Sequence, residues 1–500
     1  MSMEYCSHDA AKPFARRLAR IAGIAAIGLP VLAHAADSTQ AQIDDLQQQI
    51  DAMKASQAPA PDSSLVTDAE LKRYMAGESN LTWKGLTLYG TVDIGVSYQN
   101  HGAPLNDYFY PGVNELVQKN STKSVFGVTP SGLSQSKVGL KIEEPVTDTF
   151  NVVGKAEIGF NPQSGNLSDA VKSIQQNNGI ALANQTANAD GSRAGQVFNG
   201  EAYLGVDSRT YGRFTLGRLD SLLLDNVVAY DPMGGSYAFS LIGWSGTANG
   251  GGFTQDARLD NAARYAIRVG PFHAIALAQL NGYDSGSLGA GQADLGVNWG
   301  GLSVDATFSE VKDAIHLASV PGGVTVNGVT NNSYLAANVA DNIAEALMLK
   351  YGLGRTTVYA GYEHILSSDP SHPLSNGAQD IGGYLMAVTN NNYQSGNQVQ
   401  QIAWTGAKYG FSLKFHVTGA YYYLHQNNFS GGSCAGGTAY SNSGKCAGDE
   451  NVLSAMADYA FTRRFDIYGG VMYSHVNGGL DSGYAYNNAV SPMVGARFNF

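Results

Sequence analysis

A two-faced segment of about ten residues recurs from residue 86 to the carboxyl end, and it limits the folds open to the chain. In residues 86–98, apolar side chains such as Leu88, Val92 and Ile94 alternate with polar or small ones. Successive side chains of a β-strand point to opposite faces, so each segment predicts a strand with one apolar and one polar face. Sixteen segments are predicted: 86–98, 137–143, 150–160, 197–206, 211–218, 258–269, 272–282, 291–299, 302–311, 342–352, 355–366, 396–408, 411–425, 450–461, 464–475 and 490–500.

The connections between these segments fall into two classes. Turns such as 299–301 and 352–354 are short, whereas loops such as 99–135, 161–195 and 427–449 are long. Short turns on one rim and long loops on the other are typical of bacterial outer-membrane barrels. An even number of strands also lets the sheet close without an unpaired edge in lipid. We therefore expect an all-β fold, a 16-stranded antiparallel transmembrane β-barrel.

Composition favours a barrel in a membrane over a soluble protein. Charged residues make up 14% of the chain, against about a quarter in average soluble domains, whereas Gly (61) and Tyr (28) are abundant. Beyond the N-terminal segment, no run of eighteen apolar residues predicts a membrane helix. The formal net charge of -11 argues against nucleic acid as a partner.

The N-terminal segment predicts export. Three arginines within residues 16–20 precede the apolar run 21–32, and a small-x-small cleavage site follows at 33–35. Residues 1–35 are therefore expected to be a signal peptide cleaved near Ala35. Cleavage would remove four basic and two acidic residues, which changes the net charge from -11 to -13.

Two further segments precede the barrel. Residues 36–57 carry apolar side chains in 3-4-3 spacing, which predicts a short periplasmic coiled-coil helix of about two heptads. A disordered periplasmic tail is the alternative. Residues 58–84 read as a stiff, polar linker, and the barrel is expected over residues 85–500.

A loop of residues 219–257, rich in Gly, Ser and Asp, connects two predicted strands, and loops this long are usually functional or disordered. In the strand that follows, 258–269, period 2 places Leu259 and Tyr265 on one face and the arginines on the other. In a closed barrel these arginines would line the bore, and the acidic loop would fold inward opposite them. The candidate constriction residues are Arg213, Arg258 and Arg264 on the wall and Asp220, Asp225 and Asp231 on the loop.

Each of these candidates has a plainer interpretation. Arginines that face the lumen of any barrel are solvated and often only pair with nearby carboxylates, and loop aspartates often form turns. Arg264 lies about 20 Å from Arg258 along an ideal strand, so one ring cannot contain both.

Two cysteines, Cys434 and Cys446, remain after the expected cleavage and lie in a Gly/Ser/Asn-rich loop. Because an exported chain passes through an oxidising compartment, we expect a disulfide that closes this loop. Two free thiols are the alternative.

Short motifs spread over residues 86–500 resemble the Gram-negative general porins, particularly those of beta-proteobacteria. The resemblance depends on the order and spacing of these motifs, which stand at residues 88–90, 136–141, 198–205, 215–218, 258–261 and 496–500. It implies a homotrimer in the outer-membrane lipid bilayer, with the third loop folded inward and basic wall residues facing acidic loop residues. By motif, Lys137 and Arg258 occupy wall positions that are typically arginine, whereas Gly200-Glu201 replaces an expected arginine. The terminal Phe500 is similar to the signal read by the barrel-assembly machinery.

Together these features predict a porin for passive diffusion of small hydrophilic solutes and ions, with a weak anion preference. A substrate-specific porin for carbohydrates or dicarboxylates is the alternative, because of the coiled-coil extension and the aromatic richness. The sequence predicts no enzyme, since no Ser/His/Asp arrangement stands out, and it predicts no cofactor and no metal site.

Overall fold

The computed structural model describes the residues from Leu81 onward, with gaps. These residues are 81–102, 123–163, 165, 167, 197–242, 258–280, 289–318, 324–326, 329–331, 335–375, 377–381, 384–390, 393, 396–429, 434, 445–481 and 486–500. The signal peptide, the coiled-coil helix and most of the linker predicted above therefore lie outside the described residues. No helix among the described residues is long and apolar enough to cross a membrane.

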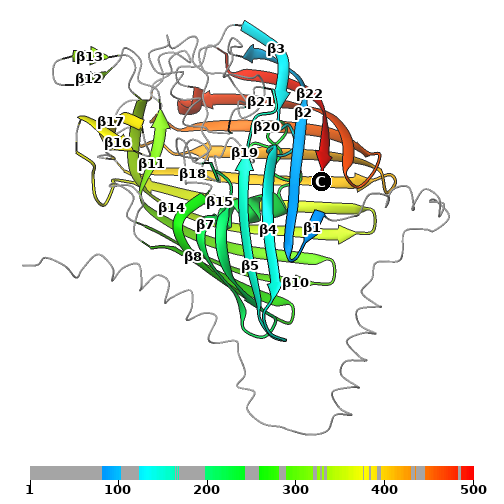
Figure 1. Cartoon of the computed structure of the whole chain (residues 1–500). Helices are drawn as coiled ribbons and strands as arrows, with labels where there is room; N and C mark the ends of the chain where they lie inside the picture. Colours follow the sequence, from blue (N-terminus) through cyan, green and yellow to red (C-terminus); the bar gives the residue numbers. More distant parts are fainter. Residues whose placement is uncertain are drawn as a thin grey trace, which may run out of the picture. The chain divides into compact units, whose positions relative to one another are not determined.

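Sixteen strands of the described part pair antiparallel in a closed ring, as predicted (Figure 1). The ring runs in chain order, and each strand pairs with its two neighbours. Its members are β2 (Leu86–Gly102), β4 (Lys137–Pro145), β5 (Asn151–Gly159), β6 (Ala202–Ser208), β7 (Gly212–Asp220), β8 (Arg258–Val269), β9 (Phe272–Gln279), β10 (Ala290–Trp299), β11 (Leu302–Ala318), β14 (Leu335–Leu353), β15 (Thr356–Ser368), β18 (Gln398–Gly410), β19 (Phe415–Gln426), β20 (Gly448–Ala460), β21 (Phe465–Gly478) and β22 (Asn488–Asn499).

The ring closes between its first and last strands. β22 pairs with β2 from Thr91↔Asn499 to Ser97↔Met493, and Figure 1 shows the red β22 beside the blue β2. The backbones of Gly90 and Phe500 also exchange two hydrogen bonds, of 2.9 and 3.0 Å. This pairing leaves neither end of the sheet as an open edge in lipid.

Several short elements were not predicted from the sequence. β3 (Lys123–Pro130) pairs with the far half of β2 and extends the line of β4 beyond a break at residues 131–136. β17 (Tyr384–Asn390) pairs parallel to the start of β14 and antiparallel to β16 (Gly377–Ile381). The remaining short elements are β1 (Leu81–Trp83), β12 (Val324–Val326), β13 (Val329–Asn331), the helix α5 (Leu222–Tyr230) and the 3-10 turn η3 (Gly479–Asp481).

The two faces of the sheet carry the expected chemistry. Apolar side chains on the outside are exposed, such as Leu453 at 58% and Leu347 at 58%, whereas the polar Thr418 and Gln400 on the inside are buried. A barrel with this pattern presents its apolar surface to acyl chains and its polar surface to the lumen.

The period-2 prediction for residues 258–269 is wrong at its beginning. The register of β7 and β8 slips between the pairs Gly217↔Ala262 and Leu219↔Leu259. At this bulge Asn261 has a φ of 52°, a left-handed conformation that asparagine tolerates better than most residues. Leu259 is therefore buried with Ala262 in one cluster, and Leu259 does not share the outer face with the 41% exposed Tyr265.

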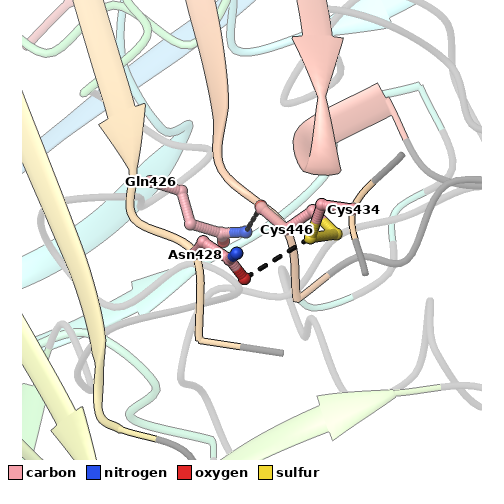
Figure 2. The surroundings of a disulfide bond; sticks show 4 residues. All are labelled: Gln426, Asn428, Cys434 and Cys446. Atoms are coloured by element: carbon pink, nitrogen blue, oxygen red, sulfur yellow. Dashed lines mark hydrogen bonds between the residues drawn. A yellow bond between two sulfur atoms is a disulfide. The ribbon is translucent and has the colours of Figure 1, made fainter. Parts of the chain in front are cut away.

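The predicted disulfide between Cys434 and Cys446 is confirmed, with a Cα–Cα distance of 5.7 Å (Figure 2). The carbonyl of Cys446 accepts a 2.9 Å hydrogen bond from the side chain of Gln426, at the end of β19. The disulfide is thereby fixed close to the rim of the barrel, just before β20 begins.

Candidate pore constriction

The predicted constriction loop begins later than expected: Leu219 and Asp220 are the last residues of β7, so Asp220 is a wall acid and not a loop acid, and the helix α5 follows them. Ser221 caps its N-terminus by accepting a 3.1 Å hydrogen bond from the backbone N–H of Leu224. Leu223, Val227 and Tyr230 follow the spacing of one helical face, and all three are buried. The helix ends at Asp231, whose N–H bonds the carbonyl of Val227, and Pro232 follows. The loop therefore presents one apolar stripe to the barrel.

This stripe and the chain that follows it pack against the inner wall, so this part of the loop lies inside the barrel. Leu223, Val227, Phe239 and Ile242 are fully buried in the largest apolar cluster of the described residues. The wall contributes side chains from successive strands to the same cluster, namely Ala344, Ala346 and Met348 of β14, Ile365 of β15, Ile402 and Trp404 of β18, Ala420, Tyr422 and Leu424 of β19, Val452 and Met456 of β20, and Tyr468 and Met472 of β21.

Directed polar contacts fix the loop on this wall. The indole of Trp404 donates to the carbonyl of Tyr230 at 3.2 Å, and the hydroxyl of Tyr422 donates to Asp231 at 2.5 Å. Further along, Ser236 Oγ donates to the carbonyl of Gly132 at 2.9 Å. Burial raises the pKa of Asp231, and the hydrogen bond from Tyr422 acts against this rise. The predicted acidic residue Asp231 therefore contacts a tyrosine of the wall in place of a basic side chain.

The end of the described loop segment contacts the strand break at residues 131–136. The rings of Phe239 and Tyr468 meet edge to face at 6.3 Å, and Tyr468 donates a 2.5 Å hydrogen bond to Asp93. Asp93 also accepts hydrogen bonds from the backbone N–H groups of residues 132–134. This buried carboxylate thus joins β2, the strand break and, through Tyr468, the loop.

Lysines and glutamates of β4, β5 and the residue before β6 form a connected charged row on the inner wall. Lys137 lies 3.0 Å from Glu157, and Lys155 bridges Glu157 at 3.5 Å and Glu201 at 2.6 Å. Tyr89 donates a 2.8 Å hydrogen bond to Glu157. Lys137 therefore lies on the wall, as the motif resemblance implied, and its charge is balanced by a carboxylate of the same wall.

The predicted arginines continue this row toward the loop. Arg258 pairs with Asp220 at 2.8 Å, and Arg264 pairs with Asp225 of α5 at 2.6 Å. Partial removal from water raises the pKa of Asp225, and the Arg264 guanidinium opposes that shift. The pair between Arg264 and Asp225 is thus a direct contact between a wall cation and a loop acid.

Arg213 lies apart from the loop acids and pairs with Asp207 of β6 at 2.8 Å. It lines a recess of about 470 Å³ together with Arg264, Asp225 and His273. Two more arginines of the recess, Arg209 and Arg268, form no ion pair among the described residues. The recess therefore holds more positive than negative side chains.

Sequence reasoning missed the wall acids Glu157 and Glu201 and the helix in the loop. A signal for the helix was present, because Ser221 and the 4-3 spacing of the buried side chains match a capped amphipathic helix. Glu201 also had a signal, because the motif resemblance placed Gly200-Glu201 at a wall position. Glu157 had none, since alternation shows which face a residue takes and not which neighbour it meets.

Comparisons with known proteins agree with this architecture. The model of the Gram-negative porin family matches residues 31–479. An outer membrane porin protein of Bordetella pertussis is 24% identical over 181 residues, which cover 36% of this chain and 38% of that protein. The match thus spans well under half of that relative.

Solved structures share the fold at low sequence identity. An anion-selective porin from Comamonas acidovorans aligns with a TM-score of 0.55 at 15% identity, over 83% of this chain and 99% of that one. OmpT of Vibrio cholerae aligns with a TM-score of 0.53 at 15% identity, over 84% and 100%.

The closed ring of sixteen strands, the loop packed inside it and the family match over most of the sequence lead to one assignment. The chain belongs to the Gram-negative porin family.

Proposed function

We propose that this porin passes small hydrophilic solutes and ions with a weak preference for anions, set by the charged row on its inner wall and by α5. The pair between Arg264 and Asp225 carries the proposal, because it joins a basic wall residue to an acidic loop residue inside the barrel. Family and fold support a channel over an enzyme.

The expected preference is weak because the row is nearly neutral. Four cations, Lys137, Lys155, Arg258 and Arg264, stand in ion pairs with four carboxylates, Glu157, Glu201, Asp220 and Asp225. Arg209 and Arg268 in the adjoining recess add positive charge. Opposed charges around a narrow, low-dielectric passage bias the passage of ions by sign, and here the balance favours anions. The relative from Comamonas is described as anion-selective.

We further propose a homotrimer and an assembly role for the carboxyl-terminal Phe500. The apolar outer face would be shared between lipid and neighbouring copies, and an OmpT structure from Vibrio cholerae is described as a trimer form. Phe500 closes the barrel by backbone pairing with Gly90 and ends in an aromatic side chain that the barrel-assembly machinery would bind.

Reversal potentials of the protein in planar bilayers under a KCl gradient test the proposed selectivity. Arg264→Ala leaves the negative charge of Asp225 unbalanced. A monovalent ion that passes about 6 Å from this carboxylate then interacts with it by about 0.7 to 1.4 kcal/mol, for an effective dielectric constant of about 80 to 40. Because this energy opposes chloride and favours potassium, the permeability of each ion should change about 3- to 10-fold, and the ratio of chloride to potassium permeability should fall about 10- to 100-fold.

Arg355→Ala is the matched control, because it removes the same charge from the short turn between β14 and β15. Equal ratios in wild type, Arg264→Ala and Arg355→Ala would refute the proposed role of the charged row. Block of the ionic current by one carbohydrate or dicarboxylate would favour a substrate-specific porin.

A further inference from the structure

Three potential metal ligands meet on neighbouring strands of the inner wall, although the sequence predicted no metal site. They are His273 of β9, Asp294 of β10 and Asp305 of β11, and their ligand atoms lie within 4.8 Å of one another. His273 Nε2 is 2.6 Å from Asp305 Oδ1 and 3.7 Å from Asp294 Oδ1. A Cβ at the intervening Gly296 would collide with both His273 and Asp305, so glycine makes room for this contact.

The two carboxylates are oriented by bonds to their outer oxygens. Asp294 Oδ2 accepts hydrogen bonds from Asn226 at 2.6 Å and from Thr307 at 2.8 Å, and Asp305 Oδ2 accepts one from the hydroxyl of Tyr230. The other oxygen of each carboxylate, Oδ1, is buried and accepts no hydrogen bond from the residues that the structure describes. These two oxygens are the atoms next to His273 Nε2. Asp294 and Asp305 are only 1% and 4% exposed.

We propose that His273, Asp294 and Asp305 bind a divalent transition-metal ion, for which Zn²⁺ is the probe. Zinc takes imidazole nitrogen and carboxylate oxygen at about 2.0 to 2.2 Å in a tetrahedron, whose ligand atoms lie about 3.3 to 3.6 Å apart. The distances of 2.6 and 3.7 Å bracket this spacing, so small side-chain shifts complete three corners. Hard cations such as Ca²⁺ and Mg²⁺ prefer all-oxygen sites and suit this set less well.

The surroundings supply an entry path and an outer shell. His273 lines the 470 Å³ recess and is 18% exposed, so an ion can reach it from the lumen. Its other ring nitrogen, Nδ1, lies 3.4 Å from the side-chain amide of Asn298. When Nε2 binds the metal, Nδ1 carries the proton and donates it to the amide oxygen after rotation of that amide.

The site also bears on the loop, because Asn226 and Tyr230 of α5 bond to the two liganding carboxylates. Metal binding would therefore hold α5 against β10 and β11. The binding itself does not depend on the proposed ion selectivity, since it needs only the folded barrel.

Equilibrium dialysis of the full-length protein in detergent against Zn²⁺ tests the proposal. Wild type should bind one high-affinity Zn²⁺ per chain, and His273→Ala should weaken that binding at least tenfold. The matched control is His416→Ala, because His416 lies beside a single carboxylate, Asp458, at 3.6 Å. Heat-modifiable migration on gels reports whether each variant has folded as a barrel.

Asp294→Asn keeps the size of the side chain and removes a ligand charge, so it should also weaken Zn²⁺ binding about tenfold or more even if His273→Ala folds poorly. Zn²⁺ binding equal in folded wild type and Asp294→Asn, or absent from folded wild type, would overturn the proposal and leave the three residues as an ion-pair cluster.

Discussion

The loop inside the barrel is held mainly by apolar packing, and Phe239 offers the sharpest test of that packing. Phe239 is 0% exposed and meets Tyr468 edge to face, and a Cβ at the adjacent Gly470 would lie 2.9 Å from its ring. Replacing a buried phenylalanine with alanine removes about 3 to 5 kcal/mol. If that loss falls on docking of the loop alone, the ratio of docked to undocked loop changes by about a hundredfold or more.

Single-channel recording measures this change directly. Because the strand pairs do not involve residue 239, Phe239→Ala should form barrels with wild-type heat-modifiable migration. Its open channel should have a larger and noisier conductance, since the undocked loop vacates part of the lumen. Limited proteolysis from the outside should also cut the variant within the loop faster than wild type.

Leu453→Ala is the control, because it removes a comparable apolar side chain from the outer face of β20, where Leu453 is 58% exposed. That variant should keep the wild-type conductance. A Phe239→Ala channel as quiet as wild type, with the same conductance and the same proteolysis rate, would refute the view that apolar packing positions the loop.

Two further predictions concern charge and the disulfide. Burial raises the pKa of Asp225, so on acidification this carboxylate loses its charge at a higher pH than an ordinary aspartate and leaves the charge of Arg264 unbalanced. Reversal potentials of the wild type should therefore shift toward stronger anion preference as the pH falls. In Asp225→Asn this shift should be smaller. Cys434 and Cys446 are separated by 12 positions, so reduction of their disulfide should destabilise the loop that it closes by about 3 kcal/mol in the chain-entropy model. Protease added to intact cells should then cut this loop faster after reduction than before it.

The strands were predictable because each strand faces lipid with one side and the aqueous lumen with the other. Alternation over ten residues is enforced by lipid on one side and water on the other, so the sixteen segments and their order could be read from the sequence. β3, β16 and β17 extend the wall beyond the predicted segments and were missed. The disulfide was predictable from the expected export of the chain and the loop that contains both cysteines.

The details of the constriction could not be read in the same way. The bulge at Asn261 shifts the phase of β8, and a period-2 pattern contains no information about an inserted residue. Asp231 looked like any other loop acid, yet its partner Tyr422 lies 191 residues away. Such contacts depend on how the loop crosses the lumen, which local patterns do not specify.

The packing of the loop against β14 to β21 divides the inner surface of the barrel into two territories with different tolerance of substitution. On the side covered by the loop, inward positions such as Ile402 and Val452 behave like the interior of a globular domain, so a deep mutational scan should find them intolerant of charge. On the side from β4 to β8, inward positions such as Lys141 and Arg268 remain wet, and exchanges there should alter permeation while expression stays normal.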